Sequence, residues 1–229
     1  MSEEVKSMFA NISNDYDYMN NVMSFGMHHL WRKRLVKISG AKAGDHILDT
    51  ASGTGDLAIE FRKAIGKEGR VLATDFCSDM LKKLPMKAIK KDVKVETELA
   101  DIMDLHYEKD SFDIVSISFG IRNVDDLHRS LAELTRVTKT GGKLMILETG
   151  KPNGILKSVY NIYSKKIMPR LGRMLIDKEE AYTYLPTTID NFPYGQEFVD
   201  LLMSTDRFKS VKAYPQFFGV SFIYECVVA

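Results

Sequence analysis

The segment Ile47-Leu48-Asp49-Thr50-Ala51-Ser52-Gly53-Thr54-Gly55-Asp56 decides how the rest of the chain is interpreted. It begins as a short apolar run typical of a buried strand, passes through two glycines and enters a helical pattern of apolar residues. Gly53 and Gly55 allow the backbone to turn sharply and to approach a ligand closely, because glycine has no Cβ. In open α/β sheets, ligands bind outside the carboxyl ends of the strands. The segment therefore predicts a strand, a ligand-binding loop and a helix.

The same alternation of short apolar runs and helix-length segments continues along the chain. The predicted strands cover residues 46–50, 71–75, 93–99, 112–118 and 143–149, and the predicted helices cover 56–64, 78–89 and 125–137. Short apolar strands separated by helices imply βαβ units around a buried, parallel sheet. The sequence therefore predicts an α/β, Rossmann-like fold with helices on both faces of the sheet.

The two ends of the chain add to this pattern. After residue 195 the sequence predicts a helix over Gln196–Met203 and two strands, near 210–215 and 219–228, that alternate loosely as an antiparallel pair does. We expect one domain with a seven-stranded, mostly parallel sheet whose last strand is antiparallel. Its parts are an N-terminal arm (1–40), a cofactor-binding core (41–150), a lid insertion after the fifth strand (151–195) and a C-terminal helix with the strand pair (196–229).

Polar residues stand where the predicted strands end. Asp75 closes the second strand, 20 residues beyond Gly55, and an acid at that position can accept both hydroxyls of a ribose. Asp101 follows the third strand, where it could accept from an adenine amine while Ile102 packs against the ring, and Ser118 ends the fourth. Because parallel strands end at one edge of the sheet, this set suits an adenosyl group lying across that edge.

The glycine loop differs from a phosphate-binding motif. Ala58 stands where the third glycine of GxGxxG would be, and no GK[ST] sequence follows, so the ligand need not carry phosphates. The predicted cofactor-binding residues are Asp49, Gly53, Thr54, Gly55, Ala58, Asp75, Asp101, Ile102 and Ser118. The alternative is that Gly53 and Gly55 form only a turn and that Asp75 caps a helix.

Charge and cysteine content exclude several classes of protein. The chain has 32 Lys and Arg against 31 Asp and Glu, so it lacks the global basic field of a nucleic-acid-binding protein. Cys77 and Cys226 make no disulfide framework, and no His/Cys cluster has metal-site spacing. We expect two free thiols, no metal and a reducing cytoplasm. The longest stretch without Asp, Glu, Lys or Arg, Tyr18–Trp31, is too polar to span a membrane.

Beyond the glycine loop, motifs spread over nearly the whole chain resemble those of one family, the ubiquinone/menaquinone biosynthesis C-methyltransferases. This is the UbiE/MenG type, which includes demethylmenaquinone methyltransferase. The resemblance implies a class I methyltransferase that takes its methyl group from S-adenosylmethionine. The resembling residues are Tyr16–Ser24, Gly26, His28 and Trp31 in the arm; Phe119–Val124; Arg136-Val137, Gly141-Gly142 and Leu147-Glu148; and, in the lid, Tyr163-Ser164, Pro169, Gly172, Asp177, Tyr182, Tyr184-Leu185, Ile189 and Phe192-Pro193.

The same resemblance implies a prenylated quinol as the substrate and methylation at a ring carbon. Arg122 is expected to stabilise a quinol oxygen, directly or through a water, and Asn123 to orient the ring. The alternative for Arg122 is a salt bridge that fixes the arm. His28 is either the base, since histidine titrates near neutrality, or a packed residue that locks the arm to Trp31. Asp49 orders the loop or meets the methionine ammonium.

The segment Lys151–Lys178 combines seven basic residues with apolar and aromatic ones, and Asp177 is its only acid. That composition fits an interfacial amphipathic helix. We expect a cytoplasmic protein, with peripheral binding to the inner face of a membrane as one reading of this segment. The alternative is a solvated basic face whose apolar side covers the active site. A homodimer or a quinone-synthesis complex also remains open. The competing functions are methylation of another small molecule and a non-catalytic scaffold that binds S-adenosylmethionine.

Overall fold

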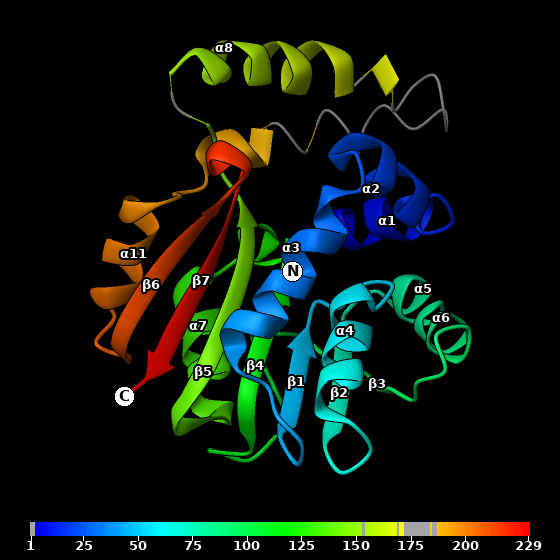
Figure 1. Cartoon of the computed structure of the whole chain (residues 1–229), viewed down its shortest axis with the longest axis vertical. Coiled ribbons are helices and arrows are strands. Elements are labelled where there is room, and N and C mark those ends of the chain that lie inside the picture. Colours follow the sequence, from blue (N-terminus) through cyan, green and yellow to red (C-terminus); the bar gives the residue numbers. More distant parts are fainter. Residues whose placement is uncertain (1–2, 153, 169, 172–183, 185–186) are drawn as a thin grey trace.

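A computed structural model of the chain describes residues 3–152, 154–168, 170–171, 184 and 187–229. Its centre is one seven-stranded sheet with the strand order β3-β2-β1-β4-β5-β7-β6 (Figure 1). All strands run parallel except β7, which is antiparallel to both of its neighbours. The strands are β1 (His46–Thr50), β2 (Arg70–Asp75), β3 (Glu96–Leu99), β4 (Phe112–Ser118), β5 (Thr138–Thr149), β6 (Phe208–Gln216) and β7 (Ser221–Val228). The predicted fold class is confirmed.

Helices cover both faces of the sheet, and β1 shows why. Its adjacent residues Ile47 and Leu48 are both fully buried, but they belong to two separate hydrophobic clusters. Successive strand residues point to opposite faces, so each cluster fills one side. Helices α3 (Met27–Ser39) and α4 (Asp56–Ile65) complete the first cluster, while α7 (Leu127–Val137) and α11 (Gln196–Met203) complete the second (Figure 1).

The largest differences from the predicted element boundaries concern one helix and two strands. The single helix predicted over 78–89 is wrong, because the structure forms two short helices, α5 (Ser78–Leu81) and α6 (Leu84–Ile89). Pro85 explains the break: it has no N–H to continue a helix but fits the first turn of a new one. Strand β3 begins at Glu96 rather than 93 and is exposed along its length, as an edge strand, whereas β5 begins five residues earlier than predicted.

The first two helices of the arm and the start of the lid lie over the carboxyl edge of the sheet, whereas α3 packs against one face (Figure 1). The arm consists of α1 (Glu3–Ile12), α2 (Tyr16–Ser24) and α3. The lid begins with α8 (Ile155–Ile162), which continues into a π-helical turn, Tyr163–Ile167. Among the described residues, none of the helices combines the length and the hydropathy needed to cross a membrane.

Candidate active site

The loop after β1 is held in a conformation that requires glycine. Gly53 and Gly55 have φ values of 56° and 85°, in the left-handed region. A Cβ on Gly55 would lie 2.2 Å from Leu84 Cγ, so the position is closed to a side chain by packing as well as by φ. A Cβ on Gly53 would approach Met80 and Tyr16, which shows that the arm reaches the loop.

Asp49 sits beneath this loop and is only 1% exposed. Its carboxylate accepts hydrogen bonds from Ser116 Oγ at 2.6 Å and Ser52 Oγ at 2.8 Å. Burial raises the pKa of Asp49 to about 6, although the two hydroxyl bonds act in the opposite direction. The bonds tie β1, the loop and β4 together, so Asp49 orders the loop from below.

Asp75 is fixed at the end of β2 by backbone donors. Its two carboxylate oxygens accept from Gly53 N at 2.7 Å and Cys77 N at 2.8 Å, and burial raises its pKa. The backbone of Phe76 also acts on this carboxylate. A carboxylate offers about four acceptor positions, so Asp75 keeps acceptor capacity for a ligand. Ser118 Oγ, at the end of β4, is buried and bonds to no group in the described part of the chain. An adenosyl ligand with ribose hydroxyls fits an edge that carries these free positions.

Four other predicted cofactor residues occupy different surroundings. Asp101 Oδ1 accepts from Met103 N at 2.9 Å, and the neighbouring Ile102 is buried. Thr54 turns its hydroxyl toward the arm, where it donates to Asp17 Oδ1 at 2.5 Å. Ala58 is fully buried in the core beneath the loop. The structure thus keeps Asp101 and Ile102 together, whereas the side chains of Thr54 and Ala58 pack against the arm and the core.

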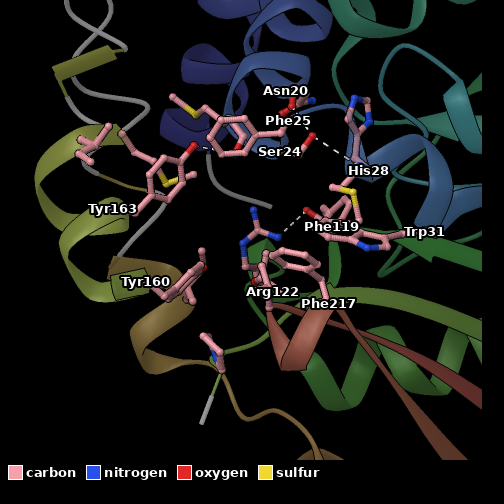
Figure 2. A pocket seen from close by; sticks show the side chains of 18 of the residues that line it. Asn20, Ser24, Phe25, His28, Trp31, Phe119, Arg122, Tyr160, Tyr163 and Phe217 are labelled. Atoms are coloured by element: carbon pink, nitrogen blue, oxygen red, sulfur yellow. Dashed lines mark hydrogen bonds between the residues drawn. The ribbon is translucent and has the colours of Figure 1, made fainter. Parts of the chain in front are cut away.

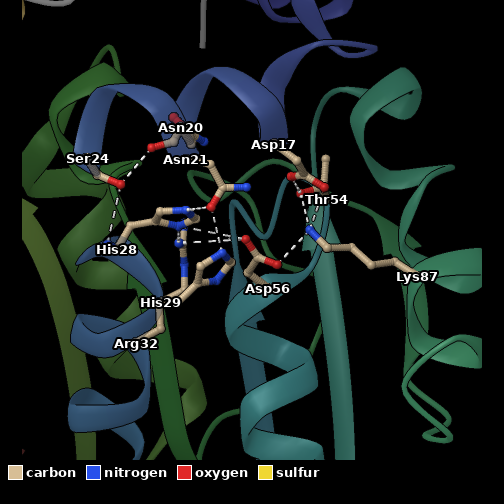
Figure 3. Close-up of polar contacts among 10 residues, drawn as sticks. All are labelled: Asp17, Asn20, Asn21, Ser24, His28, His29, Arg32, Thr54, Asp56 and Lys87. Atoms are coloured by element: carbon tan, nitrogen blue, oxygen red, sulfur yellow. Dashed lines mark hydrogen bonds and ion pairs between the residues drawn. The ribbon is translucent and has the colours of Figure 1, made fainter. Parts of the chain in front are cut away.

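A polar network ties the arm to the cofactor loop (Figure 3). Lys87 Nζ of α6 lies 2.6 Å from Asp17 Oδ2 of α2 and 2.6 Å from Asp56 Oδ1 of α4. Arg32 of α3 approaches the other oxygen of Asp56 at 3.7 Å. Burial alone would raise the pKa of Asp56, but the charges of Arg32 and Lys87 outweigh it and lower that pKa. The network therefore holds the arm closed over the loop.

His28 is part of the same network. Arg32 donates to its Nδ1, so Nε2 carries the hydrogen and donates to Asn21 Oδ1 at 3.1 Å. Burial, reinforced by the Arg32 charge, lowers the pKa of His28 to about 3. At neutral pH the ring is uncharged, and both of its nitrogens are engaged.

His28, His29 and Asp56 also form a group whose ligand atoms lie within 4.8 Å of one another. Lys87 already binds the carboxylate of Asp56, and Arg32 lies beside it. Two fixed cations would repel a divalent ion at this place. The group is therefore better explained as part of the network that fixes the arm than as a metal site.

A cavity of about 690 Å³ opens between the arm, the lid and the carboxyl edge of the sheet (Figure 2). Most of its lining is apolar and aromatic, as is common for sites that bind small molecules. Several bulky residues of its lining are exposed to solvent: Phe25, Leu156, Ile162, Ile167, Phe217 and Phe218. The cavity suits an apolar ligand that enters past these side chains.

Arg122 follows β4 and lines this cavity. Its charge is paired with a carboxylate. Its Nη1 donates to Glu148 Oε1 at 2.6 Å, and the two side chains are only 6% and 1% exposed. The salt bridge considered for Arg122 therefore exists, with Glu148 of β5 as its partner in place of the arm. Arg122 Nε and Glu148 Oε2 have no hydrogen-bond partner among the described residues. Buried polar atoms without partners are rare, so this pair suits a polar group of a ligand.

The segment that carries Arg122 is strained. Phe119 has a φ of 58°, which costs about 1–3 kcal/mol for a residue with a side chain. Its carbonyl accepts from Arg122 Nη1 at 2.9 Å and from Asn123 Nδ2 at 3.4 Å. The turn therefore places Arg122 and Asn123 together directly after β4.

The lid contacts both the arm and this turn. Tyr163 OH donates to Met23 O at 2.7 Å, and its ring lies 5.9 Å from that of Phe25. Tyr184 OH donates to Asn123 Oδ1 at 3.2 Å. These bonds close the cavity from above in the described conformation.

Sequence reasoning did not place Glu148, Lys87 or Tyr160 in the active site, although it included Glu148 in a family motif and Tyr160 in the predicted interfacial segment. Glu148 carried a detectable signal, because an acid near the end of a buried strand is rarely there for packing alone. Lys87 and Tyr160 carried none, since each meets its neighbours only through contacts between segments distant in the sequence.

Comparison with known proteins shows which family the chain resembles. Residues 1–227 match the model of the ubiE/COQ5 methyltransferase family. Two curated relatives named ubiquinone/menaquinone biosynthesis C-methyltransferase UbiE are similar over most of the chain. The protein from Bdellovibrio bacteriovorus is 45% identical over 227 residues, covering 99% of this chain and 96% of its own. The protein from Teredinibacter turnerae is 36% identical, covering 96% and 89%.

Solved structures show the same fold at much lower identity. A SAM-dependent methyltransferase from Aquifex aeolicus superposes with a TM-score of 0.64 at 17% identity, covering 93% of this chain and 98% of its own. Another, from Thermotoga maritima, gives a TM-score of 0.67 at 18% identity, covering 97% and 99%. At this identity the likeness supports the architecture alone.

Proposed function

The chain belongs to the ubiE/COQ5 methyltransferase family, and on that basis we propose that it methylates a ring carbon of a prenylated quinol in menaquinone or ubiquinone biosynthesis, with S-adenosylmethionine as the methyl donor. Demethylmenaquinol is the preferred substrate in this proposal. The observation that carries it is the cavity: a large apolar space with Arg122 in its wall. Its lining includes Phe119, the residue after Ser118, and Tyr16, which lies against Gly53 of the cofactor loop.

Bound S-adenosylmethionine supplies an electrophilic methyl group on a sulfonium. We assign the ribose hydroxyls to Asp75 and the adenine to Asp101 and Ile102, with Gly53 and Gly55 giving close approach and Ser118 offering a free hydroxyl. Asp49 acts by ordering the loop. The backbone of Thr54 completes the cradle, because its side chain faces the arm. Ala58 acts only by packing beneath the loop, since its side chain is buried and its N–H bonds to Asp49.

Asp75→Ala is expected to weaken S-adenosylmethionine binding at least about 10-fold, because a charge-assisted hydrogen bond contributes about 1.5–3 kcal/mol. Isothermal titration calorimetry measures the change. The control is Asp79→Ala, which removes an exposed acid from the following helix and should leave the affinity within about twofold. Equal affinity of a folded Asp75→Ala variant and the wild type would remove Asp75 from the site.

In the proposed reaction, the ring carbon becomes nucleophilic when a quinol hydroxyl loses its proton. Arg122 stabilises the resulting oxyanion. Asn123 does not line the cavity, so we assign it an indirect role: it fixes Tyr184, which does line the cavity beside the ring. A water takes the proton, since a guanidinium stays protonated. As the carbon–carbon bond forms, the sulfur–methyl bond breaks and leaves a neutral thioether, and the hydrogen on the methylated carbon then leaves as a proton and restores the aromatic ring. Positioning of the ring at about 3–3.5 Å from the methyl group supplies much of the remaining catalysis. For His28, a pKa of about 3 supports the role of locking the arm over that of the base.

Turnover decides between this proposal and its competitors. Purified protein is incubated anaerobically with S-adenosylmethionine and a prenylated 1,4-naphthalenediol, the corresponding benzenediol or unrelated small phenols, and products are identified by mass spectrometry. We expect carbon methylation of a prenylated diol. Preference for an unprenylated phenol would favour another small-molecule methyltransferase, and binding without any turnover would favour the scaffold. Quinone profiles of cells that lack the protein extend the test.

A prenylated substrate resides in a bilayer, so we propose that the enzyme meets it at a membrane surface. Phe25, Phe217 and Phe218 are 80%, 59% and 72% exposed at the cavity lining. The lid adds exposed basic residues, Lys157, Lys166 and Arg170. Exposed aromatic residues combined with basic ones fit the interfacial layer of an anionic membrane. Arg173 and Lys178, also predicted to take part, lie outside the described residues.

Flotation with anionic liposomes tests the membrane role. The triple variant Lys157→Glu, Lys166→Glu and Arg170→Glu should bind vesicles much less than the wild type, because each basic residue near the surface contributes about 1 kcal/mol. Binding of the wild type should also fall as salt rises.

The matched control makes the same charge change at exposed lysines of the opposite edge of the sheet, Lys42, Lys67 and Lys109. It should float nearly as the wild type does. Equal loss in both triple variants would indicate a general charge effect and contradict a lid-specific surface.

A further inference from the structure

A quinol has two ring oxygens on opposite sides of the ring, and Arg122 can bind only one of them. In an apolar cavity the second hydroxyl loses its hydrogen bonds to water. A buried hydroxyl without a hydrogen-bond partner is unfavourable by about 1–3 kcal/mol in proteins. The cavity should therefore contain a second polar group for it.

Most hydroxyl groups in the cavity lining are already engaged as donors. They are Ser24 Oγ, which donates to Asn20 O at 2.6 Å; Thr149 Oγ1, which donates to Glu148 Oε1 at 3.0 Å; Tyr163 OH, which donates to Met23 O; and Tyr184 OH, which donates to Asn123 Oδ1. Tyr16 and Tyr160 make no hydroxyl bond to any group in the part of the chain that the structure describes. Tyr16 lies against Gly53, on the cofactor side.

Tyr160 is therefore the uncommitted hydroxyl on the substrate side. It projects from α8 into the cavity, and Figure 2 shows it across from Arg122. Burial raises the pKa of Tyr160 to about 12, although the nearby Arg122 charge acts to lower it. The phenol consequently stays protonated at neutral pH, with one hydrogen to donate.

We propose that the Tyr160 hydroxyl binds the second oxygen of the diol ring, opposite the oxygen held by Arg122, and so makes the cavity selective for diols over rings with one hydroxyl. This proposal rests on the proposed function and adds the residue that recognises the substrate class. Because Tyr160 belongs to the lid and Arg122 to the sheet edge, the ring would be held between the two parts of the structure.

The test compares two ligands in two variants, each of which loses one tyrosine hydroxyl. The first ligand is a short-chain prenylated 1,4-naphthalenediol. The second is its mono-ol, which keeps only the hydroxyl next to the carbon that accepts the methyl group. Dissociation constants of both are measured anaerobically with S-adenosylhomocysteine present, and kcat/KM is measured for the diol. Tyr160→Phe should weaken diol binding about 10-fold and leave mono-ol binding within about twofold, because the lost hydrogen bond exists only with the diol.

Tyr163→Phe is the matched control on the same segment. Its hydroxyl ties the lid to the arm at Met23, so its loss should weaken the diol and the mono-ol by the same factor. An equal loss of both ligands in Tyr160→Phe, or no loss of either, overturns the assignment. Wild-type protein that fails to methylate the diol overturns the proposed function itself, so the two failures are distinguishable.

Discussion

Replacing Arg122 with alanine is expected to lower the turnover number about 100-fold or more, while the affinity for S-adenosylmethionine stays within about twofold. A loss of this size is typical when an enzyme loses one preorganised donor that stabilises a developing oxyanion. Arg122 lines the substrate cavity and follows β4 directly. Loss of its charge therefore acts on the transition state, whereas the residues assigned to the adenosyl group remain in place.

The measurement pairs steady-state turnover of the prenylated diol with calorimetry of S-adenosylmethionine. Arg207→Ala, which removes an exposed arginine just before β6 and outside the cavity lining, is the control and should keep wild-type turnover. Arg122→Lys should retain part of the activity, because it keeps the charge but loses the forked geometry of the guanidinium. Near wild-type turnover in Arg122→Ala would mean that the role of Arg122 is structural.

The second large effect concerns stability. Glu148→Ala should lower the free energy of unfolding by about 3–5 kcal/mol, since it leaves the Arg122 charge without a partner in a buried site. The two side chains are only 6% and 1% exposed, so water cannot replace the missing carboxylate without rearrangement. Urea denaturation followed by circular dichroism at pH 7 measures the loss.

A double variant separates stability from chemistry. Arg122→Met combined with Glu148→Leu replaces the ion pair with apolar side chains and should recover most of the lost stability, as buried ion pairs often contribute little compared with apolar replacements. It should remain inactive on the diol, because the cation that follows β4 is gone from the cavity wall, and Arg32, which also lines the cavity, is engaged with His28 and Asp56. A loss below about 1 kcal/mol in Glu148→Ala would contradict the pairing as described here.

The core of the fold could be predicted because its determinants are local. Residues 47–56 contain a strand, two glycines and a helix start, and the structure forms β1, the loop and α4 from them. The break at Pro85 was also a local feature, and the helical pattern of apolar residues on either side of it obscured the boundary. The long start of β5 was missed because Thr138–Gly142 carry no apolar run, although the strand pairs there with β4.

The site was less predictable because it depends on contacts between distant segments. Arg122 and Asn123 could be selected from their place after a strand, but the carboxylate that pairs with Arg122 lies 26 residues away. The bond from Lys87 to Asp17 spans 70 residues. Neither pairing has a sequence spacing that would reveal it. The low pKa of His28 likewise follows from burial against Arg32, which a sequence pattern does not report.

The position of β7 inside the sheet constrains how the chain can fold during synthesis. Residues 143–149 of β5 pair with residues 221–227 of β7, and β6 joins the sheet only through β7. Until the ribosome has released residues up to Val228, β5 presents an unpaired edge and β6 has no partner. Closing the long intervening segment costs chain entropy before this pairing repays it. The nascent chain thus holds an open, association-prone edge until β7 has been translated and has left the ribosome.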